Sequence, residues 1–153
     1  MQPASVIITV TVAASPGRVW HALVTPAEVA QWDGARPRQV PDGYPTPGQH
    51  ARWAIRLGAW PVTLHDRIRA VEPPSRLAST ITIGVIHVDE EYRLAADGSG
   101  TRLMLVDRVS SPVPGAAWLA ARWVRRTAAA GLARLAELCE ADGPAPGASL
   151  DGP

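Results

Sequence analysis

Three carboxylates stand out because they occupy strand positions that should be apolar. Between residues 61 and 110 hydrophobic residues alternate with polar ones, which is the pattern of strands with one buried face. Asp66, Glu90 and Asp107 each fall on the apolar side of their strand. An unpaired charge inside a packed core costs several kcal/mol. We therefore expect the inward side of this sheet to line a cavity.

The turns between these strands predict which side chains lie opposite each other. Gly84 and Val85 suit a two-residue hairpin loop, which sets Ser79 opposite Glu90. Keeping both apolar faces inward across the turn at residues 96–100 then sets Glu90 opposite Asp107. Extending the pairing to the earlier strands, with Leu57 opposite Val62, predicts two transverse rows of inward residues: Ala51, Ile68, Ser79, Glu90 and Asp107, and beside them Trp53, Asp66, Ile81, Val88 and Val109.

The predicted pairing of Glu90 with Asp107 has a chemical consequence. Cross-strand neighbours lie about 5 Å apart, and two carboxyl groups that close cannot both ionise cheaply away from water. One neutral carboxylic acid beside one carboxylate would form a general acid and base pair. The alternative is structural, in which the two groups are bonded to arginine side chains or to water in a polar pocket.

The elements that must position these residues can be read along the chain. Pro16 and Pro26 each follow a capping residue, Ser15 and Thr25, and predict two short helices. The expected strands are 5–12, about 36–40, 49–57, 61–71, 76–83, 86–95 and 101–110, and one long helix is expected over 112–141. Strand, two short helices, six antiparallel strands and a long helix predict an α+β fold, with a curved sheet around the last helix.

The long helix has an unusually small inward face. Ala128 and Gly131 stand where a helix packed on a sheet would normally carry larger residues, so they either leave space or allow close packing. Arg125 lies at the border of the two faces and is the nearest predicted cation to the interior. The segment 142–153, rich in Gly and Pro, is expected to be a disordered tail after one domain spanning 1–141. The loop 41–48 is either a surface connector or a cover over the cavity mouth.

Composition excludes several classes of function. All 15 basic residues are Arg, so a Schiff-base lysine is impossible. A net charge of +1 argues against a nucleic-acid partner. His65 and His87 are predicted to lie about 10 Å apart with no third ligand, so we expect no metal, and nothing indicates another cofactor. The single Cys139 and the absence of a long apolar run predict a cytoplasmic protein without a membrane span.

Three segments carry recognisable motifs: ASPGRVWHALVTPAEVAQW at 14–32, VEPPSRL at 71–77 and GTRL at 100–103. Together they resemble the START-like helix-grip superfamily, in particular its polyketide cyclase/dehydrase and Hsp90-ATPase-activator-like branches. The resemblance covers about residues 4–140 and rests on structural motifs. It implies a seven-stranded helix-grip fold with a deep, mostly apolar cavity between the sheet and the long helix. Such folds serve aromatase/cyclases, lipid and hormone carriers, sequestering proteins and co-chaperone-like modules, so fold alone does not choose the activity.

Three hypotheses follow. The first is a cofactor-independent cyclase or dehydratase acting on a hydrophobic, polyketide-like molecule, with Glu90, Asp107 and Asp66 as acid and base groups and Tyr92 or Arg125 holding a developing oxyanion. The second is a carrier or sequestering protein that uses the same cavity without turnover, and the third is a co-chaperone-like module. We expect a monomer or homodimer. The predicted ligand-binding residues are Trp53, Ile68, Ser79, Ile81, Val88, Tyr92, Leu105, Arg125, Ala128 and Gly131.

Overall fold

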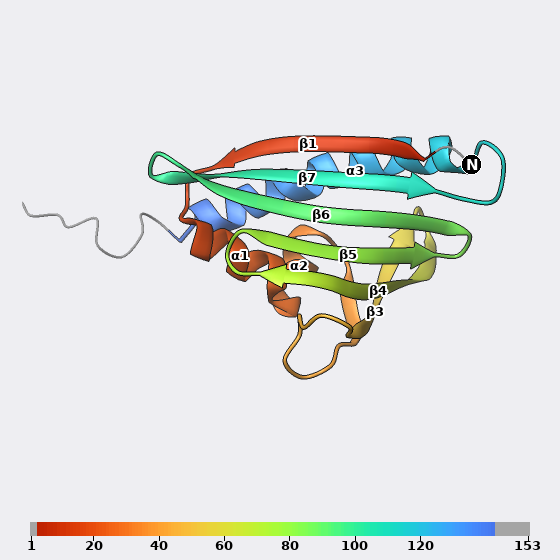
Figure 1. Ribbon diagram of the computed structural model, residues 1–153, viewed down its shortest axis with the longest axis horizontal. Helices are drawn as coiled ribbons and strands as arrows, with labels where there is room; N and C mark the ends of the chain where they lie inside the picture. Colours follow the sequence, from red (N-terminus) through yellow and green to blue (C-terminus); the bar gives the residue numbers. More distant parts are fainter. Residues whose placement is uncertain (1–2, 143–153) are drawn as a thin grey trace, which may run out of the picture.

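Seven antiparallel strands form one curved sheet along which the rest of the chain is arranged (Figure 1). The computed structural model describes residues 3–142. The strands are β1 (Ala4–Val12), β2 (Arg36–Gln39), β3 (His50–Leu57), β4 (Trp60–Glu72), β5 (Arg76–Ile83), β6 (Ile86–Asp97) and β7 (Gly100–Ser110). Their order across the sheet is β1-β7-β6-β5-β4-β3-β2. The first strand therefore returns to pair with the last, and the remaining neighbours are consecutive.

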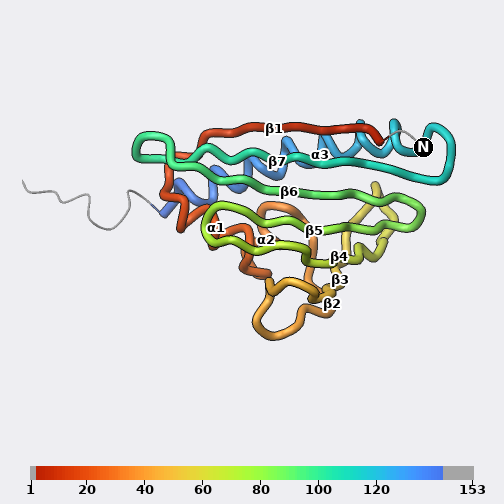
Figure 2. The backbone as a smooth tube through the Cα atoms, viewed as in Figure 1, coloured from red at the N-terminus to blue at the C-terminus, as the bar shows by residue number. Residues whose placement is uncertain are grey.

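Three helices lie on one side of this sheet (Figures 1 and 2). The two short ones, α1 (Pro16–Val24) and α2 (Pro26–Trp32), begin at the predicted prolines, and the Ser15 hydroxyl accepts a hydrogen bond from Arg18 N at the start of α1. The long helix α3 spans Ala116–Glu140. It begins four residues later than predicted, because Gly115, in a left-handed conformation with φ of 77°, ends the preceding turn. The predicted α+β helix-grip fold is confirmed.

The helix α3 packs unevenly on the sheet. Its backbone approaches β1 most extensively and β7 and β6 less, so it lies along one half of the sheet (Figure 2). The core between them includes Val12, Leu103, Leu105, Leu132 and Leu135, all almost completely buried. The opposite half, β3 to β5, is left with an inward face that α3 does not close by direct packing. This uneven packing gives the molecule room for a cavity.

The predicted register holds for the strands that carry the carboxylates. Ser79 lies opposite Glu90, and Glu90 lies opposite Asp107. Between β3 and β4 the prediction was wrong by two residues, because the hairpin closes tightly at Gly58, which has φ of 61°, and pairs Leu57 with Trp60. An even shift leaves every side chain on its predicted face.

That shift and one bulge change two predicted neighbours. Asp66 lies opposite Ala51, and Trp53 lies opposite Leu64. A register irregularity between Ile68 and Ala70 also alters the β4–β5 pairing beyond Ile68. The two transverse rows are therefore correct from β4 to β7 and offset on β3.

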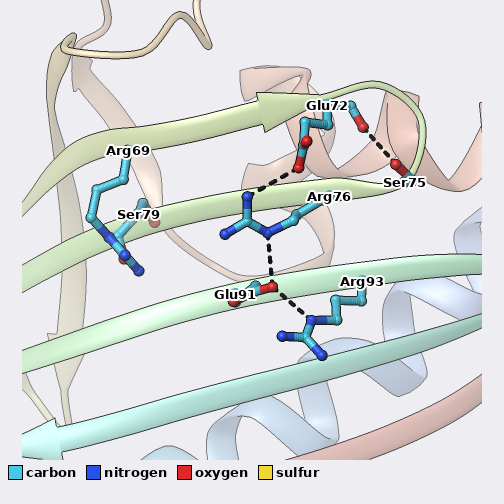
Figure 3. Close-up of polar contacts among 7 residues, drawn as sticks. All are labelled: Arg69, Glu72, Ser75, Arg76, Ser79, Glu91 and Arg93. Atoms are coloured by element: carbon cyan, nitrogen blue, oxygen red, sulfur yellow. Dashed lines mark hydrogen bonds and ion pairs between the residues drawn. The ribbon is translucent and has the colours of Figure 1, made fainter.

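The outer face of the sheet carries paired charges on β4 to β6 (Figure 3). Arg76 bonds both Glu72 and Glu91, at 3.0 and 2.9 Å, and Arg93 bonds the same Glu91 oxygen at 2.6 Å. His65, Thr82 and His87 lie opposite one another in one transverse row on this face, with Thr82 between the two histidines. Within residues 3–142, no group of three or more potential ligands is placed to hold a metal ion.

The C-terminal end of the described chain is held to the first helix. Asp142 pairs with Arg18, which also pairs with Glu28. The remainder of the predicted disordered tail, 143–153, lies outside the described residues. None of the helices in the described part of the chain is long and apolar enough to cross a bilayer.

Candidate functional site

A cavity of about 630 Å³ lies between the sheet, the short helices and α3. Its wall is mostly apolar, and its polar groups include carboxyl groups of β4, β6 and β7 and the hydroxyl of Tyr44 in the loop before β3. All three predicted acids line it: Asp66, Glu90 and Asp107. A mostly apolar cavity with a few convergent polar groups is the usual form of a small-molecule site.

Glu90 and Asp107 face each other across neighbouring strands. Asp107 is almost fully buried, Glu90 is half-buried, and both line the cavity. Burial raises the pKa of Glu90 well above its usual range, and the neighbouring negative charge of Asp107 raises it further. Burial also raises the pKa of Asp107, to about 7, whereas its interaction with Glu90 lowers it. The same interaction raises the pKa of Glu90, so a proton shared by the pair is favoured on Glu90.

Asp66 is held by a group that the sequence did not reveal. The Tyr44 hydroxyl donates a hydrogen bond of 2.8 Å to Asp66 Oδ2. Burial raises the pKa of Asp66, and this hydrogen bond acts in the opposite direction. Burial and the nearby Asp66 charge raise the pKa of the Tyr44 phenol, so it remains a donor at neutral pH.

Tyr44 brings the loop between β2 and β3 into the cavity wall. Its ring meets Trp53 edge to face at 5.9 Å between centroids. The loop is tied to β4 by two backbone bonds of 2.9 Å, from Gly48 N to the Ile68 carbonyl and from Ile68 N to the Gln49 carbonyl. The segment that was expected to be either a connector or a cover thus contributes a cavity residue. Tyr44 is the only aromatic residue in it, which is the one signal that could have identified it.

Some acid oxygens keep unused hydrogen-bonding capacity. Within the described residues, Asp66 Oδ1 and Asp107 Oδ1 are buried and have no hydrogen-bond partner. Buried polar atoms are rarely left unpaired in proteins. Such oxygens are suited to receive a hydroxyl group or another donor from a ligand.

Most of the predicted ligand-binding residues line the cavity. Seven do so: Trp53, Ser79, Ile81, Val88, Tyr92, Leu105 and Ala128. Ile68 is buried but is not part of the wall. Gly131 is close-packed instead, since a Cβ there would lie 3.4 Å from the Trp32 carbonyl oxygen. Arg125 is exposed and does not reach the wall, because one helical step turns it about 100° from Val124, which does.

The cavity mouth carries residues that the sequence analysis did not single out. Arg36 and Arg38 of β2 and Arg56 of β3 line the cavity and are exposed. Trp123 and Arg126 of α3 line it as well. Their contribution depends on the approach of β2 and β3 toward α3, which no local pattern predicts.

Comparisons with known proteins place the chain in one family. The family model described as "Polyketide cyclase / dehydrase and lipid transport" matches residues 3–140. The chain belongs to this family. No curated protein matches the chain. This family has the helix-grip fold that the sequence resembles.

Solved structures show the same fold in distant relatives. The Zhui aromatase/cyclase from Streptomyces sp. R1128 superposes with a TM-score of 0.79 at 21% identity, covering 95% of this chain and 99% of that one. Protein MLL2253 from Mesorhizobium loti gives 0.74 at 20% identity, covering 90% and 98%. DynU16, a putative protein in the dynemicin biosynthetic locus, gives 0.71 at 24% identity, covering 92% of this chain and 48% of that one. At these identities the likeness establishes the fold.

Proposed function

We propose that this member of the polyketide cyclase/dehydrase family binds an apolar, oxygenated small molecule in the cavity and catalyses its cyclisation or dehydration without a cofactor. The observation that carries the proposal is the Glu90–Asp107 pair. Two carboxyl groups face each other within an enclosed, mostly apolar wall, with their pKa values raised by burial. Such a pair can hold one proton near neutral pH and supply both an acid and a base.

The chemistry balances with these two groups alone. In a cyclisation, Asp107 would take a proton from a methylene between two carbonyl groups, and the enolate carbon would attack a second carbonyl. Glu90 would give its proton to the oxygen of that second carbonyl as the C–C bond forms. In a dehydration, Asp107 would remove the α-proton and Glu90 would protonate the departing hydroxyl, which leaves as water.

The other cavity groups support positioning. Asp66, fixed by Tyr44, would accept a hydrogen bond from a ligand hydroxyl. Tyr92, nearly buried in the wall, would hold a developing oxyanion through its phenol, since burial keeps the pKa of this phenol raised. The apolar walls confine a flexible chain in a folded conformation, and confinement of this kind favours an intramolecular reaction.

A carrier without turnover is the second candidate. The family description includes lipid transport as well as cyclase and dehydrase activity, so membership alone does not choose between them. In a carrier the same carboxyl groups would only orient polar groups of the cargo.

Conservative variants separate the two functions. A poly-β-ketone thioester serves as substrate, with cyclised product measured by mass spectrometry and ligand affinity measured in parallel. We expect Glu90→Gln and Asp107→Asn to lower turnover at least about 100-fold while retaining most of the affinity. Asp89→Asn is the matched control, because Asp89 is exposed on the opposite face of β6, where it accepts a hydrogen bond from Thr80. Binding without turnover by the unmodified protein would favour the carrier, and normal turnover in both variants would refute the assigned roles.

A further inference from the structure

Four arginines of the described chain stand at the cavity mouth without an acidic partner. Arg36, Arg38, Arg56 and Arg126 border the cavity and are exposed. Within residues 3–142, none of the four has a carboxylate within ion-pair distance or a side-chain hydrogen bond. On the outer face, by contrast, Arg76 is fully paired (Figure 3). We call these four residues the rim arginines.

The rim arginines come from β2, β3 and α3. Arg36 of β2 lies opposite Ala54, two residues from Arg56 on the same face of β3, near the edge of the sheet. Diagonal cross-strand neighbours are within reach of long side chains, and like charges so placed repel each other. Arg126 of α3 lines the same cavity. Like charges gathered around one opening carry a cost that a bound anion would remove.

Two nearby groups do not neutralise this cluster. Arg134 also lines the cavity, but its Nε donates to the Trp32 carbonyl at 2.9 Å, so that arginine is already engaged. Asp33 is the one described acid outside the interior trio that borders the cavity, against four rim arginines. The opening therefore keeps a positive balance.

The interior has the opposite character. Its wall contains the three acids Asp66, Glu90 and Asp107. An anionic group that entered deeply would meet at least one carboxylate at neutral pH, whereas at the mouth it would meet guanidinium groups. Guanidinium groups bind carboxylate and phosphate oxygens through paired hydrogen bonds. The separation of charge thus fixes a direction for an elongated ligand.

We propose that the ligand of this cavity carries an anionic end group, a carboxylate or a phosphate monoester, which the rim arginines bind while its neutral, oxygenated end lies beside Glu90 and Asp107. This inference rests on the proposed function in that it uses the same cavity. It adds the charge of the ligand and its orientation. The anion remains in water-accessible surroundings, so the interaction should weaken as salt is added.

The test uses three probes with one shared body. A hydroxynaphthyl group on a four-carbon chain ends in a carboxylate, in a primary amide or in a phosphate monoester, and binding is measured by calorimetry to the full chain. At low salt we expect the two anionic probes to bind about tenfold more tightly than the amide. The preference should fall severalfold at about 0.5 M salt. Comparing carboxylate with phosphate identifies which anion the rim prefers.

Variants locate the effect. The double variant Arg36→Gln/Arg126→Gln should lose most of the preference for the anionic probes over the amide. Arg108→Gln is the matched control, because Arg108 is exposed on the outer face of β7 and does not line the cavity. Equal affinity for anion and amide would overturn this inference and leave the proposed function standing. Equal losses in the rim and Arg108 variants would also overturn it, and failure of all three probes to bind would overturn both.

Discussion

The hydrogen bond from Tyr44 to Asp66 gives the most specific stability prediction. Replacing Tyr44 by Phe removes the hydroxyl that donates to Asp66 Oδ2 at 2.8 Å. The edge contact of the ring with Trp53 is kept, since it involves no hydroxyl. The change therefore isolates one hydrogen bond to a buried acid.

The size of the effect follows from what Asp66 loses. Its Oδ1 already has no hydrogen-bond partner within the described residues, and the variant also removes the hydroxyl that donates to Oδ2. Trp53 and Ser79 remain as neighbours that lower the pKa of Asp66. A hydrogen bond to a charged group contributes about 1.5–3 kcal/mol, and a buried group deprived of its partner costs about as much. We expect Tyr44→Phe to lower the free energy of unfolding by about 2 kcal/mol at pH 8. The pKa of Asp66 should rise further, because the bond that lowers it is lost.

Urea unfolding of a double-mutant cycle measures this directly. The cycle combines Tyr44→Phe with Asp66→Ala, and the coupling energy should be about 1–2 kcal/mol. Tyr92→Phe is the matched control, because its hydroxyl has no hydrogen-bond partner in the described chain and its loss should cost less. A coupling energy below about 0.3 kcal/mol, or equal losses in the two Phe variants, would refute the reasoning.

Two further predictions concern the whole fold. Burial raises the pKa values of Glu90 and Asp107, so the folded chain retains protons that the unfolded chain releases above about pH 4. The free energy of unfolding should therefore fall as pH rises from about 4 through 7. Thermal scans should show a shallower fall in Glu90→Gln, and an unchanged slope would contradict the raised pKa. Gly100→Ala should destabilise the fold by about 1–3 kcal/mol, because the new Cβ would lie 2.5 Å from the Val12 carbonyl oxygen. Gly17→Ala, in the open first turn of α1, should instead be neutral or stabilising by up to about 1 kcal/mol. A larger loss of stability in Gly17→Ala than in Gly100→Ala would show that the fold accommodates a Cβ at position 100.

Much of the fold was predictable because local signals agreed with one another. The two-residue hairpin at Gly84 left one choice of register, and the structure has it. The β3–β4 turn contained more candidate turn residues, so the pairing there was wrong by two. The start of α3 was also misplaced, because Pro114 is compatible with a first helical turn and only the left-handed Gly115 shows where the helix begins.

The site was predictable to the extent that it lies on strands. Alternation places Asp66, Glu90 and Asp107 inward, and the cavity wall contains all three. Tyr44 was missed because the loop that carries it has no periodicity from which a direction follows. The rim arginines were missed for a related reason, since their common location depends on the packing of β2 and β3 relative to α3. Their roles, like those of the carboxyl groups, remain predictions.

The most direct test of the central proposal is a carboxyl carbon NMR titration of Glu90 and Asp107 in the protein labelled at Asp and Glu side chains. The shared-proton pair predicts two separate titration steps, with one carboxyl group still protonated near pH 7. Asp107→Asn should then lower the pKa of Glu90 by removing the neighbouring charge. Titration of both groups below about pH 5 would mean that both are ionised at neutral pH, and the acid and base roles proposed here would be wrong.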